Sequence, residues 1–543
     1  MKAPALSVRA PRALRRVFAA WLCGVALLAS AQAQTAAAPE EGVAPSWFAH
    51  GRPVPAARQA VDILAAAAAE GLDPADYDAG ALRAQLDALG RGTAPETQAA
   101  FDAALSAAMA RYLGDVHRGR IDPRSVHAAY AGPAPEAFDA DAYLRAALAE
   151  DRVEEAARAA VPPLPLYGAL RTALAHYRTL AAGADAQAAW SLPLPLPPRR
   201  KLEPGQPYAG LALLARRLTL LGDLVADVPL PPRYEGALVD AVKRFQLRHG
   251  LAADGVVGRG TLAELEVAPA ARVRQIELTM ERLRWTPLLQ APRMIVVNVP
   301  EFMLRAYEVR DGRIEVAARM KVIVGKALDT RTPLFAEDMR FIEFSPYWNV
   351  PPSIARAELV PRLRREPGYW NAQGFEFVAG DGTANPTLST AGLDAVLRGA
   401  LRIRQRPGPH NALGDIKFVF PNNDNIYLHH TPTPQLFARD RRDFSHGCIR
   451  VEAPVELARF VLRDQPEWDE ARIREAMSAG SSKTIRVATP LPVLIAYGTA
   501  MVDAEGHAHF FRDIYGHDQL LHDTLLRRSR GNSPVAVEGG RAQ

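Results

Sequence analysis

The sequence predicts a multidomain α+β protein with a helical N-terminal part, a small helical module and a mainly-β domain that carries an insertion. Apolar residues recur at helical spacing through an alanine-rich stretch that ends near residue 190. The proline-rich segment 192–198 then interrupts the helical pattern, and β-branched runs begin at Met294. A chain of 543 residues is long enough for two to four domains of this kind.

Residues 1–33 resemble a secretory leader. They combine a basic start, an apolar stretch from Val17 to Ala29 and the small-residue signal Ala31-Gln32-Ala33. We expect cleavage after Ala33 and export. The alternative is an uncleaved membrane anchor, although the apolar stretch falls short of the roughly 20 residues that a span needs. Arg15-Arg16 leaves the export route open.

Removal of the leader changes the charge balance and the cysteine content. The whole chain has 65 Lys+Arg against 60 Asp+Glu, and the leader holds five of the basic residues and none of the acidic ones. The remainder is balanced, so nothing supports a nucleic-acid partner. Cys23 leaves with the leader, and Cys448 then has no partner for an internal disulfide.

Residues 34–200 are expected to form a helical scaffold domain. Asp73-Pro74 and Asp122-Pro123 are typical turn or helix-start signals between its helices. No cluster of residues in this range indicates chemistry, so a structural role is the simpler interpretation.

Residues 201–268 are expected to form a compact helical module. Val242, Phe245 and Leu262 are spaced to build a small core, and Gly250 stands where a helix would stop. The run from Phe245-Gln246 through Gly250-Leu251 to Asp254-Gly255-Val256-Val257-Gly258 resembles the peptidoglycan-binding module of cell-wall enzymes. The alternative is a plain helical spacer, because the motif consists mostly of core and turn positions.

Residues 290–486 are expected to form the mainly-β domain. The predicted strands are 294–299, 303–309, 317–324 and 425–429, and a helix is predicted over 455–462. An inserted cap is expected at about 351–409, with a helix over 355–364. Residues 487–543 are expected to be a C-terminal segment with a strand over 493–497 and a disordered tail, and residues 510–516 have no functional explanation from sequence.

Cys448 is a candidate nucleophile. A thiol becomes a useful nucleophile near neutral pH when a base or a positive environment favours the thiolate, and histidine is the usual partner. His429 and His430 precede Cys448 by nineteen and eighteen positions. Because consecutive strand residues point to opposite faces, only one of the two can face the thiol.

The pattern resembles the YkuD-type L,D-transpeptidase catalytic domain, in which a histidine is followed after a loop by a Ser/Thr-His-Gly-Cys motif. Here the motif is His429 and then Ser445-His446-Gly447-Cys448-Ile449-Arg450. The order of domains is similar to the long Gram-negative form of these enzymes, which implies a periplasmic location. The resemblance implies that Cys448 is the nucleophile, that His429 is the base and that the backbone carbonyl of His430 orients it. Arg450 stands where shorter members have Asn, and His430 where a smaller residue is common.

Other residues of the motif have two interpretations each. Gly447 allows close backbone approach, and the Cys448 amide is expected to be an oxyanion donor. Tyr427 is a second oxyanion donor or a packed ring, and Arg450 binds a substrate carboxylate or makes an internal salt bridge. The same choice between contact with substrate and a structural role applies to three further residues: Ser445, His446 and Trp348.

The resemblance implies a two-step acyl transfer without a cofactor. A tetrapeptide stem would acylate Cys448 with loss of D-alanine, and a second diamino acid would accept the acyl group in a 3-3 crosslink. Water or a lipoprotein lysine as acceptor would give carboxypeptidase activity or anchoring. The implied partners are peptidoglycan stem peptides and glycan, and other cell-wall synthesis enzymes are expected beside them. The family also implies acylation by carbapenems.

Three rival functions remain open from sequence. A zinc peptidase could use His429 or His430 with His446 and Cys448 as ligands, although the chain lacks a His-Glu-x-x-His motif. The others are a non-catalytic wall-binding protein and a cysteine hydrolase without transfer.

Overall fold

The computed structural model describes residues 46–90, 93–127, 130, 137–226, 229–286, 291–311, 313–326 and 330–532. The described residues all belong to one compact unit. The expected leader and the expected disordered tail beyond residue 532 lie outside the described residues. In the described part of the chain, no helix combines the length and the apolar character that crossing a membrane requires.

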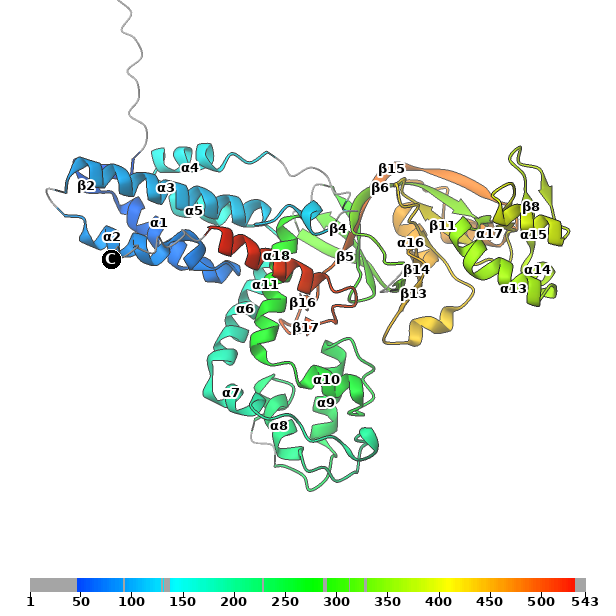
Figure 1. The fold of residues 1–543 in the computed structure, drawn as a ribbon, viewed down its shortest axis with the longest axis horizontal. Coiled ribbons are helices and arrows are strands. Elements are labelled where there is room, and N and C mark those ends of the chain that lie inside the picture. The colour runs from blue at the N-terminus through cyan, green and yellow to red at the C-terminus, as the bar shows by residue number, and fades with distance from the viewer. Residues whose placement is uncertain are drawn as a thin grey trace, which may run out of the picture. The chain divides into compact units, whose positions relative to one another are not determined.

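The N-terminal region is helical (Figure 1). Proline occupies the first turn of α1 (Pro55–Ala65), α3 (Pro95–Arg118) and α6 (Pro165–Ala182), where its missing N–H costs no helical hydrogen bond. The side chains of Asp73 and Asp122 each accept a hydrogen bond from the amide two residues on, so both Asp-Pro signals start short 3₁₀ turns. The remaining elements are β1 (Phe48–Ala49), β2 (Arg52–Pro53), α2 (Ala79–Ala88), α4 (Ala140–Ala149), α5 (Val153–Ala159), α7 (Ala184–Trp190) and the 3₁₀ turns Ala67–Glu70, Pro74–Tyr77, Pro123–Ser125 and Pro198–Arg200.

The next module packs α8 (Leu211–Leu220), α9 (Ala237–Arg248) and α10 (Arg259–Leu265) around a core that includes Val242 and Phe245, while Leu262 packs against its edge. Gly250 follows the end of α9 with φ +62°. Gln246 is buried, and its amide nitrogen donates to Asp254 Oδ1 and to the Val256 carbonyl at 2.9 Å each. The sequence motif of this module therefore closes its own Asp-Gly turn. A long helix, α11 (Pro269–Arg284), follows.

The mainly-β domain is built on one large sheet. Its strands are β3 (Arg293–Asn298), β4 (Met303–Arg310), β5 (Arg313–Gly325), β6 (Phe335–Phe344), β11 (Ile416–Val419), β12 (Leu428–His429), β13 (Asp443–Ser445), β14 (Ile449–Val451) and β15 (Lys483–Ala496). Among the described residues the strand order is β13-β5-β14-β12-β11-β6-β15-β3-β4, and an additional β4–β5 pairing closes the sheet on itself. Helices α16 (Pro454–Val461) and α17 (Glu470–Ser478) bury Leu457 and Ile473 in its core, and a 3₁₀ turn spans Pro434–Ala438.

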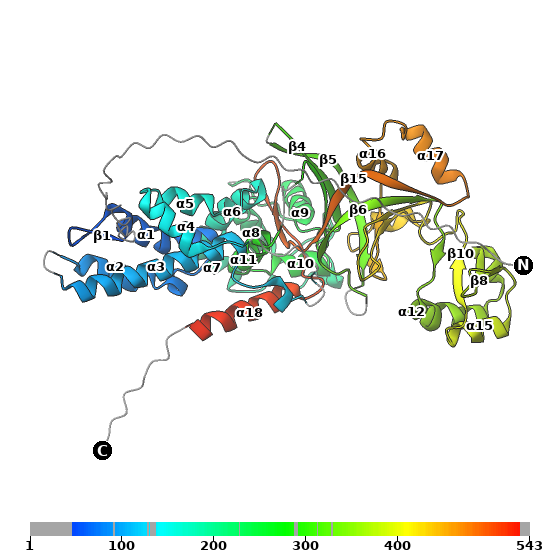
Figure 2. The ribbon, with the colours of Figure 1, turned by 90° about the horizontal axis from the view of Figure 1, so that it is seen from above.

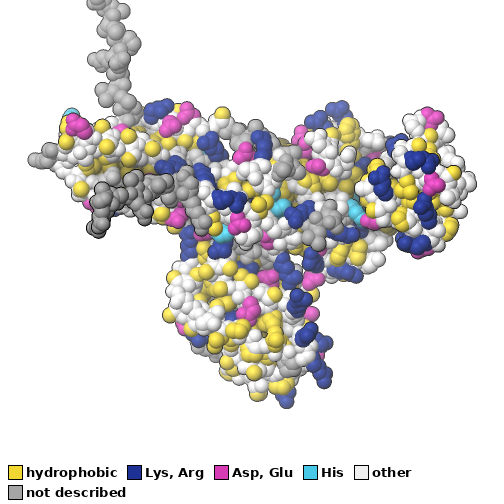
Figure 3. Space-filling view, viewed as in Figure 1, with side chains coloured by type: hydrophobic (Ala, Val, Ile, Leu, Met, Phe, Trp, Pro, Cys, Tyr) yellow, Lys and Arg dark blue, Asp and Glu magenta, His cyan; other side chains and the backbone are white. Residues whose placement is uncertain are grey.

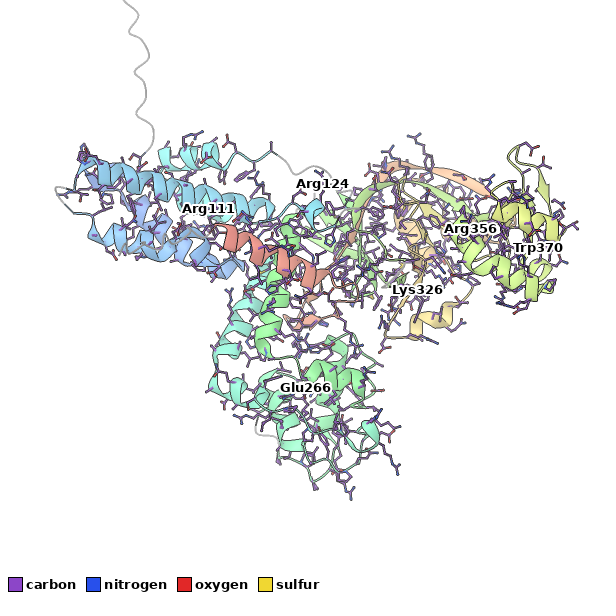
Figure 4. The ribbon with its side chains drawn as sticks, in the orientation of Figure 1. Arg111, Arg124, Glu266, Lys326, Arg356 and Trp370 are labelled. Atoms are coloured by element: carbon purple, nitrogen blue, oxygen red, sulfur yellow. The ribbon has the colours of Figure 1, made fainter. Side chains whose placement is uncertain are left out.

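The insertion has a sheet and a core of its own (Figure 2). Its strands pair in the order β7 (Trp348–Asn349), β10 (Arg402–Gln405), β8 (Phe375–Val378) and β9 (Ala384–Asn385). The helical parts are α12 (Pro352–Ile354), a π-helical turn over Ala355–Leu359, α13 (Val360–Arg365), α14 (Gly368–Gln373) and α15 (Thr390–Leu397). Trp370, labelled in Figure 4, is fully buried at the centre of this core. The predicted fold class, including the inserted unit, is confirmed.

Two local predictions are wrong. The strand expected from Asn425 begins only at Leu428, because Asn425 has φ +54° and the Asn422 side chain bonds to both the N–H and the carbonyl of Ile426. The boundary at residue 486 falls inside β15, which continues to Ala496 in the large sheet. Beyond it lie β16 (Ala500–Val502), β17 (Ala508–Phe510) and α18 (His517–Asn532).

Candidate active site

Cys448 lies in the short loop between β13 and β14. Strand β14 pairs in parallel with β12, so that Leu428 is opposite Ile449 and His429 is opposite Arg450. The Ile449 N–H donates to the Tyr427 carbonyl at 3.1 Å. This register brings the expected nucleophile and the expected base to neighbouring strands, although they are nineteen positions apart in sequence.

The environment of His429 keeps its ring neutral. The residue is buried, and its Nδ1 lies 2.5 Å from the His430 carbonyl oxygen. Because a carbonyl can only accept, Nδ1 carries the proton and the neutral ring has its lone pair on Nε2. Burial, with a smaller effect of the Arg450 charge, lowers the pKa of His429 to about 3. The ring is therefore a fixed, unprotonated base at neutral pH.

The thiol of Cys448 is also in its neutral form at rest. It is partly buried, and its Sγ is 3.6 Å from the Asn425 carbonyl oxygen. Burial raises the pKa of the Cys448 thiol, while the hydrogen bond from Tyr427 and the charges of Lys417 and Arg450 act in the opposite direction. A thiol beside a neutral imidazole differs from a preformed thiolate–imidazolium pair, so the proton has to move during the attack.

Tyr427 joins the two groups. Its hydroxyl is hydrogen-bonded to the Cys448 side chain, and its pKa is raised by burial and by the neighbouring thiol. Its ring centroid lies 5.7 Å from that of His429, and the Lys417 ammonium sits 4.3 Å from the centroid of the tyrosine ring. Tyr427 is therefore close enough to Cys448 for each group to influence the pKa of the other.

The loop before the cysteine is fixed by internal hydrogen bonds. The Ser445 hydroxyl donates to the Cys448 carbonyl at 2.5 Å and accepts from the Gly447 N–H at 3.2 Å. Gly447 has φ +112°, a conformation that side chains rarely adopt. Ser445 is only 3% exposed. Both bonds of the Ser445 hydroxyl are made within the loop, as the structural alternative to substrate contact expects.

His430 is separate from the thiol. Its Nδ1 bonds to the Asp415 carboxylate, and its side chain packs so closely on Gly414 that a Cβ there would lie 2.7 Å from the His430 Cβ. The two consecutive histidines therefore have different partners. His430 contributes to the site through its carbonyl, and the structure gives its ring no role as a competing base.

Arg450 and His446 flank the cysteine. Within the described residues Arg450 makes no ion pair, and its buried Nε has no hydrogen-bond partner. The internal salt bridge considered from sequence is therefore not found in that part of the chain. His446 Nε2 bonds instead to Glu358 Oε1 of the insertion at 2.7 Å. Trp348 packs against the core of the insertion.

The possible metal ligands considered from sequence have separate partners. His429 bonds to a backbone carbonyl, His430 to Asp415 and His446 to Glu358. Within the described ranges, no group of three His, Cys, Asp or Glu side chains is arranged to hold an ion. These side chains therefore do not converge on the thiol as a zinc site would require.

Three residues near the site were missed by sequence reasoning. Asp415 and Lys417 lie on or beside β11, which pairs with β12, and the charged positions of that strand were a usable signal. Thr332 donates from its hydroxyl to the Gly447 carbonyl at 2.7 Å. No local motif marks Thr332, since it is 115 residues from Gly447 in sequence.

The fold and the site thus define a mainly-β domain that presents a thiol, a neutral histidine and a tyrosine hydroxyl together. Residues 292–493 match the family of L,D-transpeptidase catalytic domains, YkuD. Residues 39–174 match the family described as a scaffold domain, and residues 209–265 match one described as "Putative peptidoglycan binding domain". The predicted resemblance of residues 292–493 to the L,D-transpeptidase catalytic domain is confirmed.

One curated relative and one solved structure add to this comparison. A protein of Haemophilus influenzae named "Putative L,D-transpeptidase" is 30% identical over 248 residues, which are 46% of this chain and 49% of that protein. The chain thus spans about half the length of the relative. A solved L,D-transpeptidase from Xylanimonas cellulosilytica covers 56% of this chain and 100% of its own at 15% identity, with a TM-score of 0.16. That TM-score is too low to support an argument.

Proposed function

We propose that this protein is an exported cysteine L,D-transpeptidase that forms 3-3 crosslinks in peptidoglycan. The observations that carry the proposal are the neutral His429, whose protonated Nδ1 is held by the His430 carbonyl, and the parallel pairing of β12 with β14, which brings His429 to the strand that follows Cys448. The match of residues 292–493 to the L,D-transpeptidase catalytic domain supports the same conclusion.

In the proposed first step, His429 Nε2 takes the thiol proton while Sγ attacks the carbonyl between the diamino acid and the terminal D-alanine of a tetrapeptide stem. The Cys448 N–H and the Tyr427 hydroxyl donate to the oxygen that becomes negative. Collapse of the intermediate breaks the peptide bond, and His429 returns the proton to the leaving amine of D-alanine. The products are a thioester on Cys448 and free D-alanine.

In the second step, the side-chain amine of a second diamino acid attacks the thioester. His429 accepts a proton from the amine and returns it to the departing sulfur, which regenerates the thiol. Arg450, whose Nε is free and buried beside the site, is suited to hold a stem-peptide carboxylate. On the face that Figure 3 shows, Lys and Arg side chains are interspersed with Asp and Glu.

Export to the periplasm follows in this proposal from the leader at residues 1–33, and wall attachment follows from the module at residues 209–265. Other cell-wall enzymes are proposed partners because they would supply tetrapeptide stems and glycan. Carbapenems are proposed as inhibitors, because the same thiol would open their strained amide.

Intact-protein mass spectrometry tests the proposal. The mature protein is incubated with a carbapenem and, separately, with purified disaccharide-tetrapeptide, and wild type is compared with Cys448→Ala. We expect a carbapenem adduct on wild type only, and a dimer that has lost one D-alanine. Tripeptide without dimer would indicate a hydrolase, whereas folded, reduced wild type without any adduct would overturn the proposal.

A further inference from the structure

Residues 510–516, which have no explanation from sequence, lead into a buried hydrogen-bonded segment that reaches the cysteine loop. Tyr515 is 3% exposed. Its N–H donates to the Tyr497 hydroxyl at 2.9 Å, and that hydroxyl donates to Asp513 Oδ1 at 2.6 Å. Asp513 also accepts from the N–H groups of His517 and Asp518 at the start of α18. The backbone of Tyr515 is therefore fixed by Tyr497, which directly follows β15, and this tyrosine is in turn bonded to Asp513, which also bonds to the start of α18.

The hydroxyl of Tyr515 makes contact with two segments of the catalytic domain. It donates to the Gly325 carbonyl at 2.7 Å and accepts from the Thr332 N–H at 3.2 Å. The Gly325 N–H in turn donates to the Thr332 hydroxyl at 2.9 Å. Gly325, Thr332 and Tyr515 thus form a closed set of hydrogen bonds. Lys326, which follows Gly325 in the chain, is labelled in Figure 4.

Thr332 transmits this constraint to the cysteine. Its side chain is fully buried, and its hydroxyl donates to the Gly447 carbonyl at 2.7 Å. The Gly447 carbonyl and the Cys448 N–H belong to the same planar peptide unit and point in opposite directions. Fixing the carbonyl oxygen therefore fixes the direction of the Cys448 N–H. Within the described residues no hydrogen bond engages that N–H, which leaves it free for a substrate oxygen.

We propose that Tyr515 is a positioning residue for the reaction, acting through Thr332 on the peptide plane that aims the Cys448 N–H. This inference rests on the proposed function, in which that N–H stabilises the oxyanion. Among the described residues, the group that bonds to the Gly447 carbonyl is the Thr332 hydroxyl, while the Gly447 N–H, which belongs to the preceding peptide plane, is bonded to Ser445. Loss of the Tyr515 hydroxyl would remove its bonds to the Gly325 carbonyl and the Thr332 N–H and leave Thr332, and with it the peptide plane, less restrained.

The test compares Tyr515→Phe, Thr332→Val and their double variant with wild type. Tyr515→Phe keeps the ring that stacks on Tyr497 at 5.9 Å and removes only the hydroxyl. With a carbapenem as probe, we expect the maximal acylation rate to fall about tenfold and the half-saturating concentration to stay within about twofold, because a misaimed donor affects the transition state. Alkylation by iodoacetamide, which needs no oxyanion donor, should stay within about twofold of wild type.

The matched control is Tyr143→Phe, which removes a tyrosine hydroxyl bonded to the Ala156 carbonyl at 3.1 Å in the helical region. It should acylate like wild type. The double variant should be no slower than Thr332→Val, since both changes act on one plane. Thr332→Ser, which keeps the hydroxyl, should recover the acylation rate that Thr332→Val loses. This pair of variants tests the inference even if Tyr515→Phe folds poorly.

The outcomes separate this inference from the proposed function. Absence of an adduct on wild type would contradict the proposed function. A normal wild-type adduct with an unchanged acylation rate in Tyr515→Phe and Thr332→Val would overturn the role of Tyr515. An equal loss of acylation and alkylation would also overturn it, because that result indicates general loosening of the site.

Discussion

The insertion contacts the loop that carries Cys448 directly, whereas the C-terminal segment reaches that loop through Thr332, and the two connections differ in physical kind. The insertion contributes Glu358, whose side chain is 55% exposed, in a bond to His446. The C-terminal segment contributes Tyr515, which is buried with Thr332 in a closed set of hydrogen bonds. Exposed ion pairs contribute about 0–1 kcal/mol and weaken with salt, whereas breaking a buried hydrogen bond leaves a polar group unsatisfied at about 1–3 kcal/mol. The comparison predicts that the loop depends more on the buried contact through Thr332 than on the exposed contact with the insertion.

The strongest test of this comparison uses one glycine from each contact region. A Cβ on Gly325 would lie 1.9 Å from the Thr330 carbonyl oxygen, whereas a Cβ on Gly380 in the insertion meets nothing within 4 Å. We expect Gly325→Ala to lower the free energy of unfolding by about 3 kcal/mol or more, because the backbone has to shift, and to abolish acylation. Gly380→Ala should stay within about 0.5 kcal/mol. Urea unfolding and carbapenem adduct formation measure both; a stable, active Gly325→Ala would contradict the model of a tightly set loop.

The next test is a lower pH, which should destabilise the C-terminal segment before it destabilises the insertion. Burial, with a smaller effect of the Arg282 charge, lowers the pKa of His127 to about 4, and burial together with neighbouring positive groups lowers the pKa of His517 to about 3. Their rings are 4.4 Å apart, at the start of α18. The unfolded chain binds these protons at about pH 6.5 and the folded protein does not, so stability falls as the pH drops from about 6.5 towards 3. His429 acts in the same direction in the catalytic site.

Hydrogen exchange with mass spectrometry at pH 7 and pH 4.5 would locate this effect. We expect α18 and residues 497–516 to lose protection at the lower pH before the strands of the insertion, which contains no histidine between residues 351 and 409. A His127→Gln/His517→Gln variant should show a smaller difference between the two pH values. Loss of protection that begins in the insertion would reverse the comparison.

The sequence was sufficient for the parts of the site that depend on local pattern. The Ser-His-Gly-Cys motif and the upstream histidine pointed to Cys448 and His429, and strand alternation predicted that His429 and His430 would have different surroundings. Those residues carry their information within a few positions. The contacts of Tyr515 with Thr332 and of His446 with Glu358 join residues 183 and 88 positions apart, and no periodicity or motif encodes such pairs.

The two misplaced elements have local causes that a pattern hides. The run Ile426-Tyr427-Leu428 has strand composition, but Asn425 adopts a left-handed conformation before it and the asparagine side chain of Asn422 replaces the strand bonds. Pro490 and Pro492 follow the expected boundary at residue 486. The structure accommodates them because the pairing of β15 with β6 shifts register between Arg486 and Leu491, and proline is tolerated at such irregularities.

Tyr497 offers a test of intermediate size. Tyr497→Phe removes a hydroxyl that accepts from the Tyr515 N–H and donates to Asp513, so we expect a loss of about 1–3 kcal/mol in the free energy of unfolding and slower acylation. The control is Tyr369→Phe in the insertion, where the ring lies against the Arg362 guanidinium at 3.5 Å and no hydroxyl hydrogen bond is present among the described residues. It should change stability by less than about 0.5 kcal/mol. Equal losses of unfolding free energy in the two variants would show that the C-terminal segment does not contribute more to stability than the insertion does.

The smallest effect is expected at Glu358. Glu358→Gln keeps an oxygen that can accept from His446 and removes the charge, while Glu358→Ala removes the contact entirely. Because both side chains are partly open to solvent, we expect each variant to acylate within about twofold of wild type at low salt and to match it at 0.5 M salt, where exposed charges are screened over only a few ångströms. A tenfold loss in Glu358→Ala that persists at high salt would mean that the loop depends on the insertion as much as on Tyr515. In that event the hydrogen bond between Glu358 and His446 would have to be shielded from solvent when substrate binds. Only then could one hydrogen bond to a charged group have so large an effect.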